Sequence, residues 1–257
     1  MADTDSMALA EALWQARSTR RLLPMADYPG PASLEAAYAL QGAVTAAAGA
    51  RVLGWKIGAG DPALQKRFDL PGPFVGPLLE GLVHENGATL LEMAGAALEC
   101  ELTFRLGRDL VQDHAADDTA LLSAIDAIIP SLEVIGRRFE GDPEGQGLRL
   151  VADGGINVEA VMGTPVPWSA GVSWPGVTAT LTANGSDIAT GTAVSAGLMP
   201  PATLLRWLLA QPPLSGRGLK AGELVMTGTL TGVFPLSAGV AVEADFGTLG
   251  RVTAQTA

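Results

Sequence analysis

Apolar residues recur at helical spacing in two segments near the start of the chain. In the first segment, Leu9, Leu13 and Trp14 fall on one face of a helix. The second segment lies between Ser33, a residue type that caps helix starts, and Gly49, a residue type that ends helices. We therefore expect two amphipathic helices, joined by a loop, in this part of the chain.

A regular alternation of apolar and polar residues predicts a strand over residues 98–106. Side chains on a strand point alternately to opposite faces, so every second residue shares a face. The apolar members are Leu98, Cys100, Leu102, Phe104 and Leu106, and the polar members are Glu99, Glu101, Thr103 and Arg105. We expect the apolar face to pack against the core, with Cys100 as a core thiol.

The rest of the pattern is mostly β from about residue 81. Residues 51–80 are rich in glycine and proline and predict loops with short strands. We further expect a helix over 118–129 that stops at Pro130, a short strand over 132–135, a hairpin around Asn184-Gly185, a helix over 204–209, and late strands over 223–226 and 240–244. The fold class that follows is α+β, with a helical and loop region over residues 1–80 and a β-rich domain over 81–257.

Composition and charge argue against several classes of protein. Apolar residues make up 48% of the 257 residues and no apolar run approaches the roughly 20 residues of a membrane helix. The formal charge of −11 would repel the phosphates of a nucleic acid. The acidic first residues lack the features of a signal peptide, and the single cysteine cannot form an internal disulfide. We therefore expect a cytoplasmic protein that binds neither membranes nor nucleic acids.

Three glutamates are candidates for a metal site. Glu99 and Glu101 project from one face of the predicted strand, and neighbouring carboxylates repel each other unless a cation lies between them. Glu133 lies in an equally apolar segment and could supply a third carboxylate from a separate strand. Such an all-oxygen set would select Mg²⁺ or Mn²⁺. The spacing alone favours the simpler alternative, an ordinary solvent-exposed face.

Two further segments could line a pocket. Lys56 lies within Gly54-Trp55-Lys56-Ile57-Gly58, where an apolar setting would depress its pKa or require a carboxylate partner; the alternative is a surface lysine with a buried stem. Residues 226–232 end a strand in a Gly/Thr loop that could offer N–H groups and hydroxyls to an anion, or could simply connect two elements.

Other residues of chemical interest have simpler interpretations. His84 and His114 lie in polar segments, and we expect them at the surface. Asn157 and the glycine-rich run 153–155 are interpreted as a turn. The sequence contains neither a P-loop nor a Rossmann fingerprint in a strand–helix context.

Taken in order, these segments resemble the 2-keto-4-pentenoate hydratase family of the fumarylacetoacetate hydrolase superfamily. The resemblance covers nearly the whole chain, and each piece is weak alone while the order and spacing are specific. The segments are Ala37-Tyr38-Ala39-Leu40-Gln41, Gly54 to Gly58, Ala63-Leu64-Gln65, Pro73 to Glu80, Leu98 to Leu102, Leu106 to Leu110, Pro130 to Val134, Val151-Ala152-Asp153, Gly228 to Gly232 and Phe246 to Gly250.

The resemblance implies a fold, a cofactor and roles for individual residues. It implies a fumarylacetoacetase-like β-roll in which Glu99, Glu101 and Glu133 bind Mg²⁺ or Mn²⁺. Lys56 and Glu80 would be the catalytic residues, facing one cavity. The residues that would bind substrate are Gln65, Asp153 and Thr229.

The activity implied first is hydration of 2-hydroxy-2,4-dienoates during degradation of aromatic compounds. Decarboxylation of 2-oxo-3-enedioates is the runner-up, because both activities can share this metal site. An acylpyruvate C–C hydrolase is disfavoured because no histidine stands beside the motifs, and a non-catalytic partner subunit is a further alternative. The substrate would be a small 2-oxo acid, and the protein a homo-oligomer that could associate with a companion pathway enzyme.

Three positions depart from the family's pattern. Glu80 stands where the family has the shorter aspartate, and Gly154 replaces an asparagine, which removes an amide. The segment around Gly197-Leu198-Met199 lacks the usual histidine or asparagine and predicts a more apolar pocket wall. These departures affect the expected substrate more than the expected metal chemistry.

Overall fold

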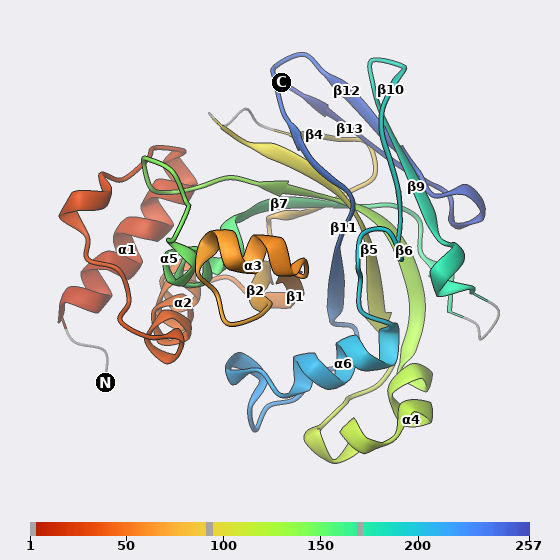
Figure 1. Ribbon diagram of the computed structural model, residues 1–257, viewed down its shortest axis with the longest axis horizontal. Helices are drawn as coiled ribbons and strands as arrows, with labels where there is room; N and C mark the ends of the chain where they lie inside the picture. The colour runs from red at the N-terminus through yellow and green to blue at the C-terminus, as the bar shows by residue number, and fades with distance from the viewer. Residues whose placement is uncertain (1–3, 91–94, 169–171) are drawn as a thin grey trace.

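Two curled β-sheets form the centre of the protein, and the helices lie around them (Figure 1). The computed structural model describes residues 4–90, 95–168 and 172–257. The larger sheet has the strand order β2-β1-β11-β5-β6-β7-β3, with β8 beside β6. Its strands are β1 (Val52–Gly58), β2 (Phe74–Leu79), β3 (Val83–Glu85), β5 (Ala97–Leu106), β6 (Ile125–Ile135), β7 (Asn157–Met162), β8 (Val166–Pro167) and β11 (Leu224–Pro235).

The smaller sheet is antiparallel except at the edge formed by β4, which pairs in parallel with β13. Its order is β10-β9-β12-β13-β4, and the strands are β4 (Ala88–Leu90), β9 (Thr178–Ala183), β10 (Ser186–Thr192), β12 (Ala241–Asp245) and β13 (Arg251–Thr256). The predicted hairpin is confirmed: Asn184 and Gly185 join β9 to β10 with φ angles of 47° and 78°. These positive values are the ones that a two-residue hairpin turn requires.

Both predicted N-terminal helices are confirmed, as α1 (Thr4–Thr19) and α2 (Leu34–Ala48). The Ser33 hydroxyl accepts a hydrogen bond from the N–H of Ala36, and Gly49 ends α2 in the left-handed region. Short 3-10 helices occupy Met25–Asp27, Gln112–Ala116, Gly154–Ile156, Trp174–Gly176, Pro212–Leu214 and Gly247–Leu249.

A buried glutamine attaches α2 to the larger sheet. Gln41 Nε2 donates to the carbonyl of Val75 in β2 at 2.9 Å and to the carbonyl of Val151 in α5 (Gly147–Ala152) at 2.6 Å. The hydroxyl of Tyr38 accepts the N–H of Val75 at 3.2 Å. Since both side chains are buried, these bonds fix how the helical layer sits on the sheet.

The structure corrects the prediction for residues 51–80. β1 and β2 are buried strands, and α3 (Pro62–Phe68) lies between them, where only loops and short strands were expected. Asp61 caps α3 by accepting the N–H of Ala63. The helix buries none of its residues fully, and its apolar face consists only of the half-buried Leu64 and Phe68, which is too short for the periodic pattern to reveal. β1 pairs in parallel with β11 and antiparallel with β2.

The prediction of a helix over 118–129 is wrong beyond the first half of that segment. α4 (Asp118–Ser123) is followed directly by β6, which runs through Pro130. An apolar strand buried on both faces cannot be distinguished from a helix by periodicity. The carbonyl of Pro130 accepts the N–H of Gly163 in the gap between β7 and β8. The N–H and C=O groups of a strand residue point to the same side of the strand. The position where Pro130 lacks an N–H therefore also faces this gap, so the pairing with β5 loses no hydrogen bond.

The late elements are confirmed with one extension. α6 (Pro201–Leu209) buries Leu204, Leu205, Leu208 and Leu209, as its apolar spacing predicted. The late strands are β11 and β12, but β11 continues to Pro235 through residues 226–232, which were expected to be a loop. Its pairing with β5 shifts register twice in this stretch, so the segment is a bulged strand. In the described ranges, no helix has both the length and the apolar character needed to cross a membrane.

Gly155 lies close to the side chains of Lys56 and Phe74, and its substitution tests how much this close packing contributes to stability. Its φ is +70°, and an added Cβ would lie 2.6 Å from the Phe74 ring and 2.9 Å from Lys56 Cε. Gly154 is a matched control, because its φ is +65° and its nearest neighbour would be 3.7 Å away. Both Gly→Ala changes strain the backbone, but only Gly155→Ala adds a steric clash. We expect Gly155→Ala to lower the free energy of unfolding by about 1–3 kcal/mol more than Gly154→Ala in urea denaturation. Equal losses would contradict the clash.

Candidate metal centre and cavity

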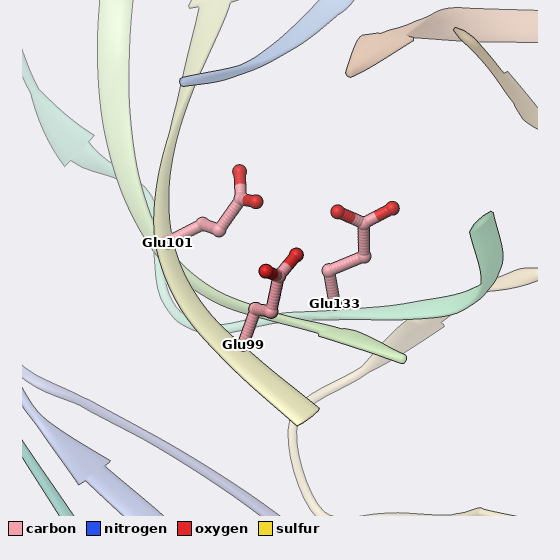
Figure 2. A group of neighbouring side chains, drawn as sticks. All are labelled: Glu99, Glu101 and Glu133. Atoms are coloured by element: carbon pink, nitrogen blue, oxygen red, sulfur yellow. The ribbon is translucent and has the colours of Figure 1, made fainter. Parts of the chain in front are cut away.

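Three glutamate side chains from two adjacent strands point into one space (Figure 2). Glu99 and Glu101 lie on β5, and Glu133 lies on β6, where it is the direct cross-strand partner of Glu99. One carboxylate oxygen from each residue lies within 4.8 Å of the others. Glu101 and Glu133 are buried, and Glu99 is partly buried. The face that the spacing alone assigned to solvent is therefore an interior face.

Burial and mutual repulsion perturb this group. Burial first, and then the charge of Glu133, raise the pKa of Glu99 from 4.5 to about 8. Burial, then Glu133 and Glu99, raise the pKa of Glu101 well above its usual value. Within the described part of the chain, Glu101 Oε1 and Glu133 Oε2 are buried without a hydrogen-bond partner. Buried oxygens of this kind are costly to leave unpaired.

Three groups partly compensate the carboxylates. Lys56 Nζ lies 3.3 Å from Glu133 Oε1, and Asn157 Nδ2 donates to the same oxygen at 2.9 Å. The N–H of Gly228 in β11 donates to Glu101 Oε2 at 2.9 Å. Burial opposes the charge of Lys56, but Glu133, Glu99 and Glu101 together raise the pKa of Lys56 above its usual value. The prediction that Lys56 has a carboxylate partner is confirmed, and its pKa is not depressed.

The charge and the ligand atoms of the site suit a hard divalent cation. When ionised, three carboxylates and one ammonium leave a formal charge of −2, which one divalent cation cancels. The two orphaned oxygens are acceptors without donors, and hard oxygen ligands suit Mg²⁺ or Mn²⁺. The residues present therefore fit a divalent cation.

A cavity of about 380 Å³ opens above the carboxylates. Lys56, Glu99 and Glu101 line one part of it. The apolar lining includes Ile57, Phe74, Leu198 and Met199, and further polar groups come from Asp61, Arg67, Arg137, Thr227 and Thr229. The apolar wall expected around Met199 is confirmed. The cavity thus combines a charged floor with an apolar side, as small-molecule sites commonly do.

Thr229 lies in the cavity wall, but its environment differs from the predicted anion loop. Its hydroxyl donates to the carbonyl of Gly232 at 3.0 Å, and the neighbouring N–H of Gly228 already binds Glu101. Thr227 is buried and lines the cavity, and its hydroxyl has no hydrogen-bond partner among the residues described. Of the hydroxyls that this segment contributes to the cavity lining, the one without a partner is therefore that of Thr227, which the sequence did not single out because Gly/Thr segments are common.

The structure does not bring Glu80 to the cavity. Glu80 is exposed and accepts a hydrogen bond from Arg51 Nη2 at 2.9 Å. The prediction that Glu80 and Lys56 share one cavity is therefore wrong. β2 ends at Leu79, so the side chain at position 80 follows the strand out into solvent.

Gln65 and Asp153 lie behind the cavity wall. Gln65 Nε2 donates to the carbonyl of Ala59 at 2.8 Å, which holds the loop after β1. Asp153 is buried, and its Oδ1 accepts Arg138 Nε at 2.7 Å. Both side chains are engaged with the protein itself, so the structure places them as supports of wall segments and not in the cavity.

Asn157 and Arg17 are site residues that the sequence did not identify. Asn157 was interpreted as part of a turn, yet it begins β7 and binds Glu133. Arg17 was not considered, because it lies in a helix more than a hundred residues away in sequence; it is buried and donates to Asn157. The position of Gly154 bears on this pair: an added Cβ there would lie 3.9 Å from Arg17 Nη1. A side chain at position 154 would therefore begin close to Arg17.

Comparisons with known proteins identify a matching family and several relatives of this chain. The family model described as fumarylacetoacetate (FAA) hydrolase C-terminal matches residues 81–257. The chain is 28% identical over 249 residues to a 2-keto-4-pentenoate hydratase of Paraburkholderia xenovorans, covering 95% of this chain and 91% of the relative. It is 29% identical over 240 residues to a 2-oxo-hept-4-ene-1,7-dioate hydratase of Escherichia coli, covering 88% of each.

The fold is that of a solved 4-oxalocrotonate decarboxylase from Pseudomonas putida G7, a structure complexed with magnesium and adipate. The TM-score is 0.87 at 22% identity, over 100% of this chain and 99% of the other. The predicted fumarylacetoacetase-like α+β fold is therefore confirmed.

The raised pKa values predict how pH acts on the metal centre. In the absence of metal, a folded-state pKa of about 8 for Glu99, against an ordinary 4.5, means that the folded protein holds a proton that the unfolded chain releases. Stability without metal should therefore fall as pH rises from about 4.5 to about 8, and Mg²⁺ should offset the loss. We expect Mg²⁺ affinity, measured by calorimetry, to rise by about tenfold or more per pH unit below pH 8, and to level off only when both Glu99 and Glu101 are ionised.

Glu99→Gln should weaken Mg²⁺ binding and flatten this pH dependence, because it removes one charged oxygen ligand and one titrating group. Glu85→Gln, at an exposed position, serves as the matched control. Affinity that is independent of pH in the unsubstituted protein would contradict the assignment.

Proposed function

This chain belongs to the fumarylacetoacetate hydrolase family, and from that premise we propose that it is a metal-dependent hydratase of small 2-hydroxy-2,4-dienoates and their 2-oxo-4-enoate tautomers. The observation that carries the proposal is the meeting of three glutamates and one lysine, of which Lys56, Glu99 and Glu101 line a partly apolar cavity. The names of the relatives, hydratases of 2-keto-4-pentenoate and of 2-oxo-hept-4-ene-1,7-dioate, support this activity class.

Glu99, Glu101 and Glu133 are the proposed ligands of Mg²⁺ or Mn²⁺. When bound, the cation supplies a Lewis acid that can hold the substrate's carboxylate and 2-oxygen and offset the negative charge that develops there. The protein's own part is to hold the carboxylates in place. Gly228 fixes Glu101 through its N–H, and Asn157 fixes Glu133.

Lys56 is the proposed proton carrier. Its raised pKa keeps it an ammonium at neutral pH, and its Nζ lies at the cavity floor beside Glu133. Conversion of a 2-hydroxydienoate into a 4-hydroxy-2-oxo acid requires protonation of carbon and addition of water. An ammonium next to the bound 2-oxygen can donate a proton or stabilise the enolate form.

The walls of the cavity account for orientation of the substrate. The unpaired hydroxyl of Thr227 can donate to a substrate oxygen near the carboxylates, and Thr229 lies on the same strand. Phe74, Leu198 and Met199 present apolar surface to the hydrocarbon part and limit the access of water. In this arrangement Gln65 and Asp153 act on the substrate only through the wall segments they hold.

A second candidate function is decarboxylation of a 2-oxo-3-enedioate, and two arginines favour it. Arg67 and Arg137 both line the cavity, so guanidinium groups are available to a second carboxylate. Arg67 lies 3.8 Å from Asp142, which balances part of its charge. Hydration remains the first choice because the curated relatives reported above are hydratases.

Assembly and location rest on the sequence. We infer a homo-oligomer that could also associate with a companion enzyme of the same pathway. We infer a cytoplasmic location because the single cysteine, Cys100, cannot form an internal disulfide.

Turnover of a substrate panel tests the proposal. The protein is treated with EDTA, reloaded with Mg²⁺ or Mn²⁺, and incubated with 2-hydroxypenta-2,4-dienoate and with a 2-oxo-3-enedioate. We expect metal-dependent loss of dienol absorbance without CO₂ release. Release of CO₂ would establish the decarboxylase instead. Cleavage of an acylpyruvate into two acids would favour a C–C hydrolase, and metal binding without any turnover would favour a non-catalytic subunit.

Substitution of Lys56 separates catalysis from metal binding. Lys56→Met should lower kcat by about 10²- to 10⁴-fold, because it removes the proton carrier. Mg²⁺ affinity should stay the same or increase, since a positive charge beside Glu133 is lost. Lys66→Met, on the exposed face of nearby α3, is the control. Unchanged kcat in Lys56→Met would show that the lysine has only a structural role.

A further inference from the structure

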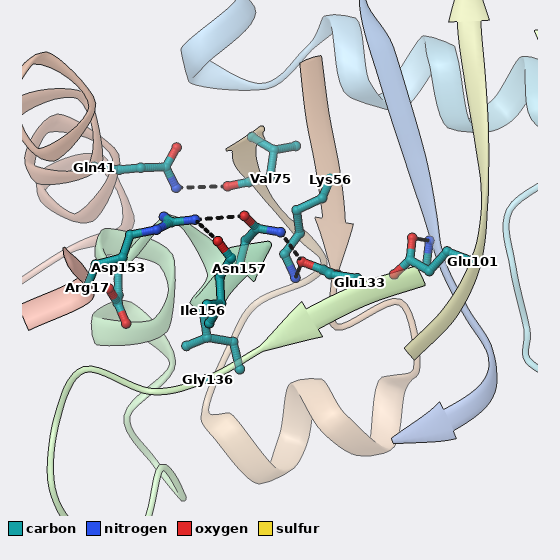
Figure 3. A network of polar contacts seen from close by, with 12 residues as sticks. Arg17, Gln41, Lys56, Val75, Glu101, Glu133, Gly136, Asp153, Ile156 and Asn157 are labelled. Carbon is teal, nitrogen blue, oxygen red and sulfur yellow. Dashed lines mark hydrogen bonds and ion pairs between the residues drawn. The ribbon is translucent and has the colours of Figure 1, made fainter. Parts of the chain in front are cut away.

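A chain of polar contacts runs from helix α1 to the carboxylate site (Figure 3). Arg17 is 8% exposed, and its Nη2 donates to Asn157 Oδ1 at 2.8 Å and to the carbonyl of Val158 at 3.0 Å. Asn157 Nδ2 then donates to Glu133 Oε1 at 2.9 Å. The N-terminal helix is thereby connected to a proposed metal ligand through a single side chain.

The chemistry of the guanidinium determines which way the amide of Asn157 points. A guanidinium has donors and no acceptor, so the amide oxygen of Asn157 must face Arg17. The amide NH₂ group must then face Glu133. With Asn157 and Lys56 both at Glu133 Oε1, the other oxygen, Oε2, has no protein partner in the described ranges and is the one left for a cation.

From these contacts we infer that Arg17 is a positioning residue for the metal site, acting through the amide of Asn157 on Glu133. The inference rests on the proposed metal-dependent function. Reversal of the amide would place its oxygen against a carboxylate oxygen, which would repel Glu133 and move Oε2. Loss of Arg17 leaves the amide held only at its Glu133 end, so Asn157 can shift or rotate and Glu133 loses a fixed partner; metal binding should therefore weaken although no ligand is changed.

Docking of α1 does not explain why Arg17 is present. Leu9, Ala10, Leu13 and Ala16 are buried in the core and hold the helix on apolar contacts. Burial of a guanidinium is costly and the nearby Arg138 adds to that cost, while Asp153, Glu133 and Glu159 offset part of it. The donation to Val158 helps to hold α1 on β7, whereas the donation to Asn157 reaches the carboxylate site and gives the arginine a role beyond docking.

Metal affinity in a double-mutant cycle tests this role. Mg²⁺ and Mn²⁺ binding is measured by calorimetry on Arg17→Met, Asn157→Ala and the double variant, with folding checked by circular dichroism and thermal melting. We expect Arg17→Met to weaken metal binding about 10- to 100-fold, the range typical for partners of metal ligands. In the Asn157→Ala background, Arg17→Met should add little further loss, because the two residues act in series.

Two further variants separate positioning from simple docking. Arg17→Lys keeps one charged donor, so it should give an intermediate metal affinity, and it serves if Arg17→Met does not fold. Leu13→Ala loosens α1 without touching the polar chain, so it should lower the melting temperature and leave metal affinity unchanged.

Each result of these measurements supports or contradicts the positioning role of Arg17. Unchanged metal affinity in folded Arg17→Met or in folded Asn157→Ala would overturn the inference while leaving the proposed function intact. Additive losses in the double variant, or an equal loss of affinity in Leu13→Ala, would assign Arg17 to docking alone. Failure of the unsubstituted protein to bind either metal would overturn both the positioning role and the proposed function.

Discussion

Glu99, Glu101 and Glu133 place three carboxylates on one interior face of a mixed β-sheet, and the rest of the site is organised around their repulsion. Glu99 and Glu133 are direct cross-strand partners, an arrangement that destabilises a sheet when both carry charge. Protons or a cation must offset this repulsion. One lysine, one amide and one backbone N–H reduce it, and two carboxylate oxygens remain without donors.

The groups that offset the carboxylate charge come from distant parts of the chain. Lys56 lies on β1, Gly228 lies on the bulged part of β11, and Asn157 lies at the start of β7. The pairing of β1 with β11 and of β11 with β5 places Lys56 and Gly228 beside the carboxylates, and the pairing of β6 with β7 places Asn157 there. Arg17 extends the same polar network into α1 (Figure 3). The N-terminal helix and the sheet therefore share one electrostatic unit.

The cavity above the carboxylates divides into regions with different chemistry. Its floor is anionic and suits a cation that would hold the acid end of a substrate. Leu198 and Met199 form an apolar side, while Arg67 and Arg137 bring positive charge to the lining. The three positions that were expected to depart from the family's pattern lie at different depths. Met199 faces the cavity, Gly154 lies beside Arg17, and Glu80 lies at the surface.

The sequence by itself determined the features that depend on local pattern: the amphipathic helices, the Asn184-Gly185 hairpin, the strand carrying Glu99 and Glu101, and the fold through its ordered resemblance. Tertiary structure decided the burial of that strand's polar face, the strand through Pro130, and the surface position of Glu80. It also decided the contacts of Arg17 and Asn157. Local spacing fixes which face of an element a residue occupies, whereas what covers that face depends on segments more than a hundred residues away.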